Sequence, residues 1–412
     1  MINADFATKL LAEFGSPLYV YDADEIACRA GALRAALPED AFLLYSLKAN
    51  PLPAVGRLLH QQGYGAEISS SGELDAALAA GFAPDKILYT GPAKTTGEIR
   101  AALAANVSLF SCESWSDLDR LAAEVDRPVR VLLRVNPPAP PQAQLAMSGV
   151  ASQFGFEPGD LVVERLRLLP PTLRIAGIHI YYGSQIATVA ALSAAMEMAL
   201  RTAESLAQSL DLPLQILDIG GGFPAPYAVT GAEVDLTPLR DHVLRFRQQG
   251  PRTSGAALWF ESGRYLSASS GALLSTVMAV KAGKEGRTFV VLDAGINCLG
   301  GMAGLGRIFR HLVQIIPLRP PADAEEKTVD IVGPLCSPLD YLARDVKTPP
   351  LAPGDVVAIP NVGAYGLTAS LVHFLSRPAP VEVVYRGHQV LDSYQIQARH
   401  KRISMDESAV GS

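Results

Sequence analysis

The stretch AFLLYSLKAN, residues 41–50, runs from apolar and aromatic residues directly into Lys48. A short apolar run of this kind is typical of a buried β-strand. A lysine is costly inside an apolar layer unless it is paired, neutralised or used chemically. A single lysine at a strand end is more often simply solvated. The role of Lys48 therefore depends on what the rest of the chain brings to it.

The same pattern of an apolar run followed by a helical segment recurs along the chain. The runs are FLLYSLKAN, GAEISSSGE, ILYTGPAK, VSLFSCES, RPVRVLLRVNP, IAGIHIYYGSQ, LQILDIGGGF and AALWFESGRYL. Capping signatures at Ser70–Glu73 and Thr95–Glu98, with stop glycines at Gly63 and Gly81, bound some of the helices between them. Eight such units predict an α/β fold, a closed parallel (β/α)8 TIM-like barrel. A doubly wound open sheet is the alternative.

The pattern changes after about residue 265. The segments ALLSTVMAV, RTFVVLDAG, TVDIVGPL, GDVVAIP and VEVVYRGHQVLD are joined by turn residues, and helical spacing is scarce. They predict a C-terminal antiparallel β domain. We expect the barrel at residues 25–265 and the β domain at 266–412.

Composition excludes several classes of protein. The chain has 412 residues, is 49% hydrophobic and 18% charged, and carries a net charge of −6 without a basic run. Nucleic-acid and membrane partners are therefore not expected. The four cysteines are widely spaced, which indicates reduced thiols in a cytoplasmic protein and no metal site. The N-terminal MINADFATKLLAEFG predicts a short amphipathic helix and not a signal peptide.

Chemically competent residues fall where the predicted strands end, which is where active sites of such barrels lie. They are Lys48, Ser69 to Ser71, Arg134, Asn136, His179, Gly220 to Gly222, Glu261 and Arg264. Each has an ordinary structural explanation, such as a tight turn for the glycines or a core position for the histidine. Together they fit one ligand. Glycine N–H groups and Arg264 suit a phosphate, His179 can stack on an aromatic ring, and Glu261 needs a cationic partner such as a protonated ring nitrogen.

Pyridoxal 5′-phosphate (PLP) has that phosphate and that ring nitrogen, and it has an aldehyde that a lysine can attack. Lys48 would then form a Schiff base with it. At this point the sequence resembles a known family. The motifs YSLKAN, HI..GSQ, DIGGGF, ESGRYL, GPLCSPLD and GAYG are similar to those of PLP-dependent decarboxylases of alanine-racemase-like fold, which include diaminopimelate and ornithine decarboxylases. The resemblance extends from PLYVYD at residues 17–22 to Tyr365 and beyond.

The resemblance implies a role for each matching residue. Lys48 is the Schiff-base lysine, His179 stacks on the ring and Glu261 pairs with its nitrogen. The phosphate is held by Ser184, Gly221, Gly222, Arg264 and Tyr365. Cys336 and Asp340 would reach the active site of the partner subunit in a homodimer with shared sites, with Cys336 as proton donor. Arg264, Cys336 and Asp340 are the expected substrate contacts, and residues 1–24 are expected to pack with the β domain.

The matching residues favour one reaction, and the departures bear on the substrate. Glu261 favours decarboxylation, because racemases of this fold place an arginine at that nitrogen. Ser337 follows Cys336 where diamine-specific members carry an acidic residue, and the Arg-Pro-x-Leu-Tyr segment that helps to bind diaminopimelate is missing. Tyr181 and Tyr182 lengthen the usual His-x-Gly-Ser-Gln motif. Further departures are Gln153, Ser262 and the glycine-rich segment 297–310, which contains Arg307 and Arg310.

This pattern is most similar to the branch that decarboxylates glutamate bound to a carrier protein. The expected function is thus decarboxylation of an amino acid, free or carrier-tethered, by a carbon–carbon lyase. Three alternatives stay open: diaminopimelate decarboxylase in lysine synthesis, an amino-acid racemase, and a PLP carrier without enzyme activity.

Overall fold

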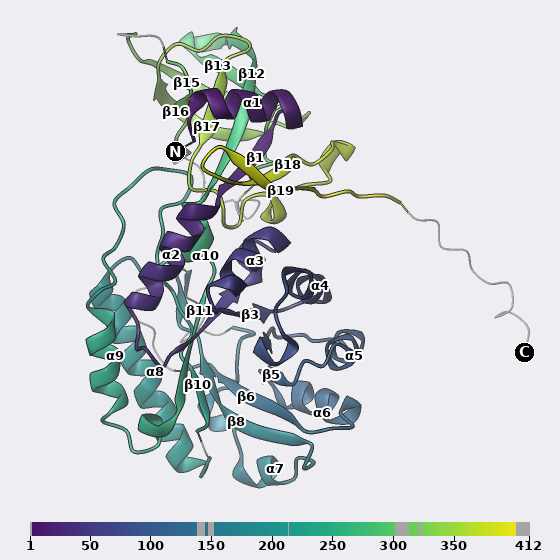
Figure 1. Ribbon diagram of the computed structural model, residues 1–412, viewed down its shortest axis with the longest axis vertical. Coiled ribbons are helices and arrows are strands. Elements are labelled where there is room, and N and C mark those ends of the chain that lie inside the picture. Colours follow the sequence, from purple (N-terminus) through teal and green to yellow (C-terminus); the bar gives the residue numbers. More distant parts are fainter. Residues whose placement is uncertain are drawn as a thin grey trace, which may run out of the picture.

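The computed structural model describes residues 2–137, 145–146, 152–212, 214–300, 313–320 and 324–400. Figure 1 shows a barrel with the β domain at one end of it. The barrel is closed and its eight strands pair in the order β10-β11-β2-β3-β4-β5-β6-β8, all parallel. The strands are β2 (Phe42–Ser46), β3 (Gly65–Ile68), β4 (Ile87–Tyr89), β5 (Leu109–Cys112), β6 (Val129–Val135), β8 (Leu173–Ile180), β10 (Ile216–Asp218) and β11 (Ala257–Ser262). The predicted closed barrel is confirmed, and the open sheet is excluded.

A helix follows each barrel strand, and the longer of these helices lie on the outside of the barrel (Figure 1). These helices are α3 (Pro53–Gln61), α4 (Ser71–Ala80), α5 (Thr96–Ala104), α6 (Trp115–Glu124), α7 (Val163–Arg167), α8 (Val189–Ser209), α9 (Leu239–Arg247) and α10 (Arg264–Ser267). The capping box at Thr95 is complete, with Glu98 bonding back to the Thr95 N–H. At α4 the box is only half formed: Ser70 Oγ accepts from the Glu73 N–H, but the Glu73 carboxylate bonds Ser69 instead.

The barrel interior has an apolar lower part and a polar upper part. Leu44, Leu88, Leu109, Leu132, Ile216 and Trp259 pack together inside the strands. Side chains alternate along a strand, so the residue two positions later also points inward. In each of these strands that residue is polar, and β3 and β8 add Glu67 and His179. We call this buried set the polar ring: Ser46, Glu67, Thr90, Ser111, Arg134, His179, Asp218 and Glu261.

The β domain contains a nine-stranded sheet among the described residues. Its strands are β1 (Leu18–Asp22), β12 (Gly271–Ala282), β13 (Thr288–Leu292), β14 (Ile316–Pro317), β15 (Lys327–Val332), β16 (Tyr341–Thr348), β17 (Val356–Ile359), β18 (Val381–Arg386) and β19 (Gln389–Gln395). The expected antiparallel sheet is in fact mixed, because β1 pairs parallel with β18 and β13 pairs parallel with β15. Turn residues predict hairpins, but they do not reveal pairings between strands that are distant in sequence.

The N-terminal segment lies in the β domain (Figure 1). Helix α1 (Ala4–Phe14) begins at Asn3, whose side chain accepts hydrogen bonds from two backbone N–H groups. Its residues Phe6 and Leu10 pack with strand residues Leu18 and Leu274. β1 inserts between β12 and β18, and α2 (Ala23–Ala35) then leads into the barrel.

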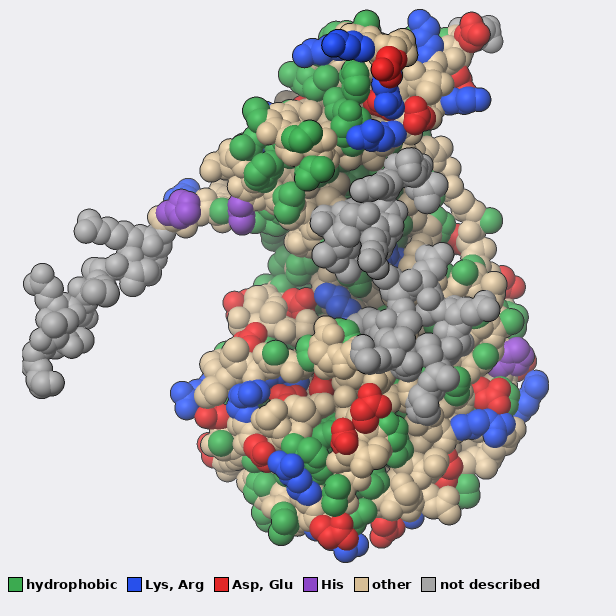
Figure 2. All heavy atoms as spheres, turned by 180° about the vertical axis from the view of Figure 1, so that it is seen from behind, with side chains coloured by type: hydrophobic (Ala, Val, Ile, Leu, Met, Phe, Trp, Pro, Cys, Tyr) green, Lys and Arg blue, Asp and Glu red, His purple; other side chains and the backbone are tan. Residues whose placement is uncertain are grey.

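The surface carries charges of both signs. Figure 2 shows basic and acidic side chains interspersed over the barrel on the face that it presents. Within the described ranges, no helix is long and apolar enough to cross a membrane. All four cysteines are free: Cys28 and Cys336 are exposed, while Cys112 and Cys298 are buried.

Candidate active site

Lys48 lies where β2 ends, in a single helical turn, η1 (Leu47–Ala49). Its Nζ lies 3.2 Å from Glu67 Oε2 and 3.4 Å from Glu67 Oε1. Glu67 also accepts a hydrogen bond from the Thr90 hydroxyl. The lysine side chain is 39% exposed and the carboxylate only 2%. The amine is therefore held by a buried partner yet faces open space.

The charges around Lys48 favour its ammonium form. Burial alone would lower the pKa of Lys48, but the carboxylates of Glu67 and Glu261 raise it above its usual range. Burial likewise opposes ionisation of Glu67, and Lys48 and Thr90 lower the pKa of Glu67 nonetheless. The pair is thus Lys48 as ammonium and Glu67 as carboxylate.

His179 ends β8 as a buried, neutral imidazole. Its Nδ1 lies 2.8 Å from Ser111 Oγ, and its Nε2 lies 3.4 Å from Glu261 Oε1. Burial lowers the pKa of His179, and the cations Arg134, Lys48 and Lys94 lower it further. The ring is therefore contacted from β5 and β11, each two strands away from β8 in the barrel, and it is uncharged.

Two further buried acids, Glu261 on β11 and Asp218 on β10, lie near His179. Burial raises the pKa of Glu261, and the neighbouring carboxylates of Glu67 and Asp218 raise it further. Burial raises the pKa of Asp218 to about 7, although its Oδ1 accepts a hydrogen bond from the Gly220 N–H. Side-chain ligand atoms of His179, Asp218 and Glu261 all lie within 4.8 Å of one another. These residue types also bind divalent metals, so Glu261 would serve either a metal or a cationic ring nitrogen.

The turn after β10 needs its glycines. A Cβ on Gly221 would lie inside the carbonyl of Glu261, and one on Gly222 would lie 2.8 Å from the Gly183 oxygen. Gly220 and Gly222 also have positive φ angles of 67° and 86°. The turn packs against β9 (Gly183–Ser184), since the Ile186 N–H donates to the Gly222 carbonyl. The turn that carries Gly221 and Gly222 thus lies beside the segment that carries Ser184.

Arg264 lies between two tyrosine rings at the junction of barrel and β domain. Its guanidinium carbon is 4.6 Å from the ring centre of Tyr365 and 5.4 Å from that of Tyr227. The Tyr227 hydroxyl donates to the Tyr365 carbonyl, and the Tyr365 N–H donates to the carbonyl of Ala49, beside Lys48. Tyr365 from the β domain therefore meets Lys48 and Arg264 at the barrel end.

Other strand-end candidates have structural partners. Ser69 and Ser70 cap α4 through Glu73, and Ser71 begins that helix. Arg134 Nη1 forms a buried ion pair with Glu113 at 2.8 Å. The Asn136 amide donates to Glu157 at 2.7 Å. These contacts stabilise loops around the pocket.

Cys336 and Asp340 lie in the loop between β15 and β16 of the β domain. Cys336 is exposed, whereas Asp340 is 3% exposed. The Asp340 carboxylate accepts hydrogen bonds from the Ile296 and Leu335 N–H groups of its own chain, at 2.8 and 2.7 Å. Of the two, Cys336 is the residue whose side chain can reach another molecule. Asp340 holds the loop that carries it.

Sequence reasoning missed several pocket residues: Glu67, Thr90, Ser111, Asp218, Glu113 and Tyr227. Glu67 and Asp218 are carboxylates within or directly after apolar strands, the same feature that identified Glu261. Applying that criterion to every strand would have found both. Ser111 and Thr90 give no such signal, because hydroxyl groups are common in strands. Arg307 and Arg310 lie outside the described residues.

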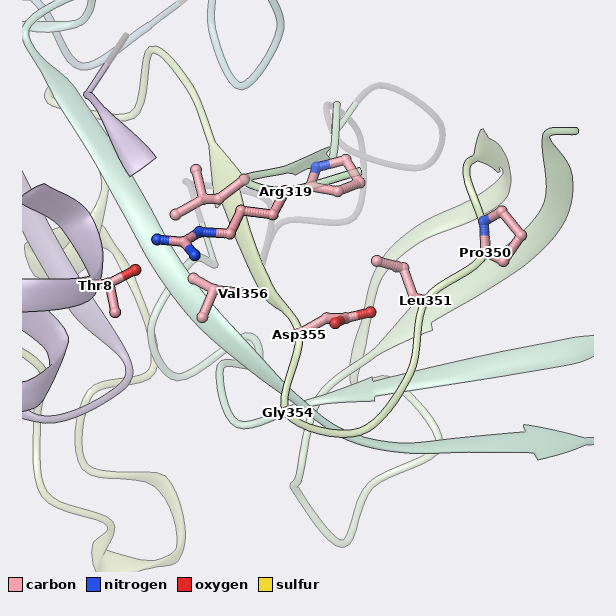
Figure 3. A pocket seen from close by; sticks show the side chains of 9 residues that line it. Thr8, Arg319, Pro350, Leu351, Gly354, Asp355 and Val356 are labelled. Atoms are coloured by element: carbon pink, nitrogen blue, oxygen red, sulfur yellow. The ribbon is translucent and has the colours of Figure 1, made fainter. Parts of the chain in front are cut away.

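A surface cavity of about 240 Å³ lies elsewhere, between α1 and the start of β17 (Figure 3). Thr8, Arg319, Leu351, Asp355 and Val356 are among its lining residues. Arg319 already forms an ion pair with Asp5. The cavity lacks the convergence of titratable groups that marks the barrel end, so we place the active site at Lys48.

The barrel pocket fits PLP. Among the described residues, Glu261 Oε1 and Arg264 Nε are buried and make no hydrogen bond. Such groups are costly unless a ligand satisfies them. A ring nitrogen at Glu261 and a phosphate at the glycine turn and Arg264 would do so, with the aldehyde within reach of Lys48.

Comparisons with known proteins agree with this geometry. The family model for the pyridoxal-binding domain of pyridoxal-dependent decarboxylases matches residues 23–268. A relative from Niallia circulans, named as a decarboxylase of an L-glutamyl group on the BtrI acyl-carrier protein, is 33% identical over 94% of this chain and 93% of its own. Diaminopimelate decarboxylase of Aquifex aeolicus is also 33% identical, over 93% of this chain and 89% of its own. The crystal structure of Helicobacter pylori diaminopimelate decarboxylase superimposes with a TM-score of 0.81 at 27% identity, covering 93% of this chain and 95% of that one.

Proposed function

The chain belongs to the pyridoxal-dependent decarboxylases, and we propose that it removes the α-carboxylate of an amino acid carried on a carrier protein. PLP is the cofactor of this family. The observation that carries the proposal is the meeting of Lys48, Glu67, His179 and Glu261 at one barrel end.

We propose the following roles for the pocket residues. Lys48 would hold PLP covalently, His179 would stack on its ring and Glu261 would pair with the ring nitrogen. The phosphate is held by Ser184, Gly221, Gly222, Arg264 and Tyr365. The support is geometric: the glycine turn leaves no room for side chains, and the guanidinium of Arg264 lies over the rings of Tyr227 and Tyr365.

When bound, PLP supplies an electron sink for the electron pair that remains when carbon dioxide leaves. The chain's own residues prepare that sink. Glu261 holds a proton at the ring nitrogen, and a buried carboxylate is a strong partner for such a cation because little water competes. His179 stays neutral beside it and adds no repelling charge. This charge arrangement favours decarboxylation over racemisation.

We also propose a homodimer in which Cys336 enters the partner's pocket. Apolar side chains near Cys336 are unusually exposed: Leu339 by 76%, Leu371 by 47%, Phe374 by 39% and Leu375 by 49%. Arg377 joins their segments, since its Nη2 donates to the Pro334 carbonyl. A patch of this kind is typical of a covered interface. Asp340 would contribute to the shared site by fixing the Cys336 loop.

Replacing Cys336 with alanine is expected to lower turnover roughly 100-fold, the effect typical of losing a general acid. The thiol would donate its proton to the carbon that lost carbon dioxide. The visible absorbance of bound PLP should be unchanged, because Cys336 does not hold the cofactor. Turnover and product stereochemistry in heavy water provide the measurement. Cys28→Ala, another exposed free cysteine, is the control.

A mixing experiment tests whether the site is shared. In the proposed scheme, Lys48→Ala chains are inactive and Cys336→Ala chains retain about 1% of the parent turnover. If sites are shared, the mixed dimer contains one complete pocket and regains activity. Unaltered turnover in Cys336→Ala, or mixed chains that stay inactive although they exchange subunits, would argue against the donor role and the shared site.

The carrier-bound substrate is supported by the Niallia circulans relative and by Ser337. A serine cannot pair with the distal ammonium of a diamine as a carboxylate would. We expect carbon dioxide release from glutamyl carrier protein to exceed that from free glutamate or free meso-diaminopimelate by at least about 100-fold in kcat/KM, roughly 3 kcal/mol of binding. The assay is radiolabelled carbon dioxide release over these three substrates. Equal rates on free and carrier-linked glutamate would contradict the proposal.

Diaminopimelate decarboxylase is the second candidate, because several relatives at 31–34% identity carry that name. Rapid conversion of free meso-diaminopimelate to lysine would establish it. Inversion of the α-carbon without carbon dioxide would instead indicate a racemase. PLP binding without turnover of any amino acid, free or tethered, would indicate a carrier.

We propose a division into a barrel at residues 25–265 and a β domain at 266–412 that also takes up residues 1–24. It is supported by the pairing of β1 with β12 and β18. The last barrel strand ends at Ser262, and the first strand of the β domain after it begins at Gly271.

A further inference from the structure

The lengthened motif HIYYGSQ places one additional aromatic side chain toward the pocket. Inward and outward positions alternate past the end of β8: Ile180 and Tyr182 pack in the core between barrel and helices. His179 belongs to the polar ring, so Tyr181 is the next inward residue above it. Tyr181 is only partly buried, as expected at the barrel opening.

The ring of Tyr181 lies beside the amine of Lys48. The Nζ atom is 5.8 Å from the ring centre. Space for the ring comes from Gly220, where an added Cβ would lie 2.6 Å from Tyr181 Cδ2. The position of the ring is thus set by the end of β8 and by a glycine in the turn that follows the neighbouring strand, β10.

We propose that Tyr181 is a positioning residue for Lys48, whose ring face stabilises the cationic form of the Lys48 amine. An aromatic face attracts an ammonium within about 6 Å of its centre. The other groups whose charge acts on this amine come from several elements: Glu67 on β3, Glu73 on α4, Asp218 on β10, Glu261 on β11 and Tyr365 of the β domain. Tyr181 is uncharged at neutral pH, since burial raises the pKa of its phenol to about 12. Its ring face therefore stabilises the Lys48 ammonium in addition to these charged groups.

The consequence concerns cofactor loading, and it rests on the proposed role of Lys48. Only the neutral amine attacks an aldehyde: its nitrogen bonds the aldehyde carbon, and the aldehyde oxygen leaves as water. Below the pKa of the amine, the rate of capture is proportional to the neutral fraction. A weaker ring–ammonium contact should therefore speed capture of PLP by the cofactor-free protein.

Fluorination tests the contact without changing the size of the pocket much. Tyr181→Phe retains the ring face, and phenylalanines carrying one, two or three fluorines at the same position weaken it stepwise. The readout is the rate at which visible absorbance appears when PLP is added to cofactor-free protein at pH 7.5. We expect Tyr181→Phe to capture PLP at close to the unsubstituted rate. The trifluorinated ring should capture it about threefold faster, a shift of roughly half a pH unit in the amine.

Tyr182→Phe is the matched control, because Tyr182 packs in the core and should leave the rate unchanged. A flat rate across the fluorine series, or a Tyr181→Phe rate that already differs severalfold, would overturn the inference. Glu67→Gln is a reference variant. Because it removes the charged partner of Lys48, it should speed PLP capture more than any of the fluorinated phenylalanines at position 181. If Lys48→Ala gains the same absorbance, the proposed function fails instead, whatever the series shows.

Discussion

Lys48→Ala is expected to abolish the visible absorbance that PLP acquires when it is bound to a lysine. Decarboxylation should fall by roughly 1000-fold or more, at least about 4 kcal/mol of lost transition-state stabilisation. No described lysine other than Lys48 combines a strand-end position with open space and a buried carboxylate partner. Lys94 is enclosed, with its Nζ bonded to two carbonyls and Asp117.

The loss should be chemical and not a loss of fold. The Lys48 side chain is 39% exposed, and its removal leaves the apolar interior intact. It does leave Glu67 without its cation, so the pKa of that carboxyl should rise as burial takes over. Once protonated, Glu67 keeps its contact with the Thr90 hydroxyl and buries no unpaired charge, so thermal melting should change little while absorbance and activity disappear together.

Lys86→Ala is the control, because Lys86 precedes β4 at the opposite end of the barrel and its side chain lies over Phe42. Absorbance spectra, borohydride labelling followed by peptide mapping, and carbon dioxide release give three independent readouts. Persistence of the band together with activity in Lys48→Ala would refute the assignment of the site.

The barrel could be predicted from sequence because each of its strands is both apolar and followed by a helix. Strands such as β2 and β11 are buried on both faces, so hydrophobicity marks them clearly. The β domain was harder. Its parallel pairs, β1 with β18 and β13 with β15, join segments that no local turn connects.

The active site was predictable where a residue breaks the pattern of its strand, and less so elsewhere. Lys48, His179 and Glu261 stand out because charged or imidazole groups follow apolar runs. The ion pair of Lys48 with Glu67 depends on the pairing of neighbouring strands, which appears only once the barrel closes. The enclosure of Asp340 depends on the loop after β13, far from it in sequence.

The alternation of the strands gives a more general rule for this fold. In these strands, the residue of the polar ring lies two positions after the inward apolar residue. Once that apolar residue is identified in a strand, the position of the polar residue is therefore known. Applied to β10, the rule passes from Ile216 to Asp218, which the motif-based approach assigned no role. The departures in the lengthened HIYYGSQ segment follow the same alternation, which is why Tyr181 and not Tyr182 faces Lys48.

Glu261→Gln is expected to lower the decarboxylation rate by about 100- to 1000-fold while PLP stays bound. Glutamine keeps the size and a hydrogen bond but removes the negative charge that holds a proton on the ring nitrogen. The loss of one preorganised electrostatic partner in a buried site costs about 3–4 kcal/mol in the transition state. The PLP dissociation constant should change far less, because the phosphate contacts and Lys48 are untouched.

The number of protons exchanged with solvent on PLP binding depends on the protonation of Glu261. Burial and the acids Glu67 and Asp218 raise the pKa of Glu261, so before PLP binds its protonation is more favourable than that of an exposed glutamate. A cationic ring nitrogen beside Glu261 would favour its carboxylate form and lower its pKa again. The proton that Glu261 gives up when PLP binds should reduce the net number of protons that the parent protein takes up from solvent near neutral pH. Glu261→Gln has no such proton to give.

Single-turnover carbon dioxide release separates the chemical step from cofactor binding, and calorimetry in two buffers counts the protons. Glu73→Gln is the control, because Glu73 caps α4 next to Ser69 and contributes no contact to the ring position. A rate within about twofold of the parent for Glu261→Gln would mean that the ring nitrogen needs no charged partner here. The choice of decarboxylation over racemisation would then have to come from other residues at the barrel end.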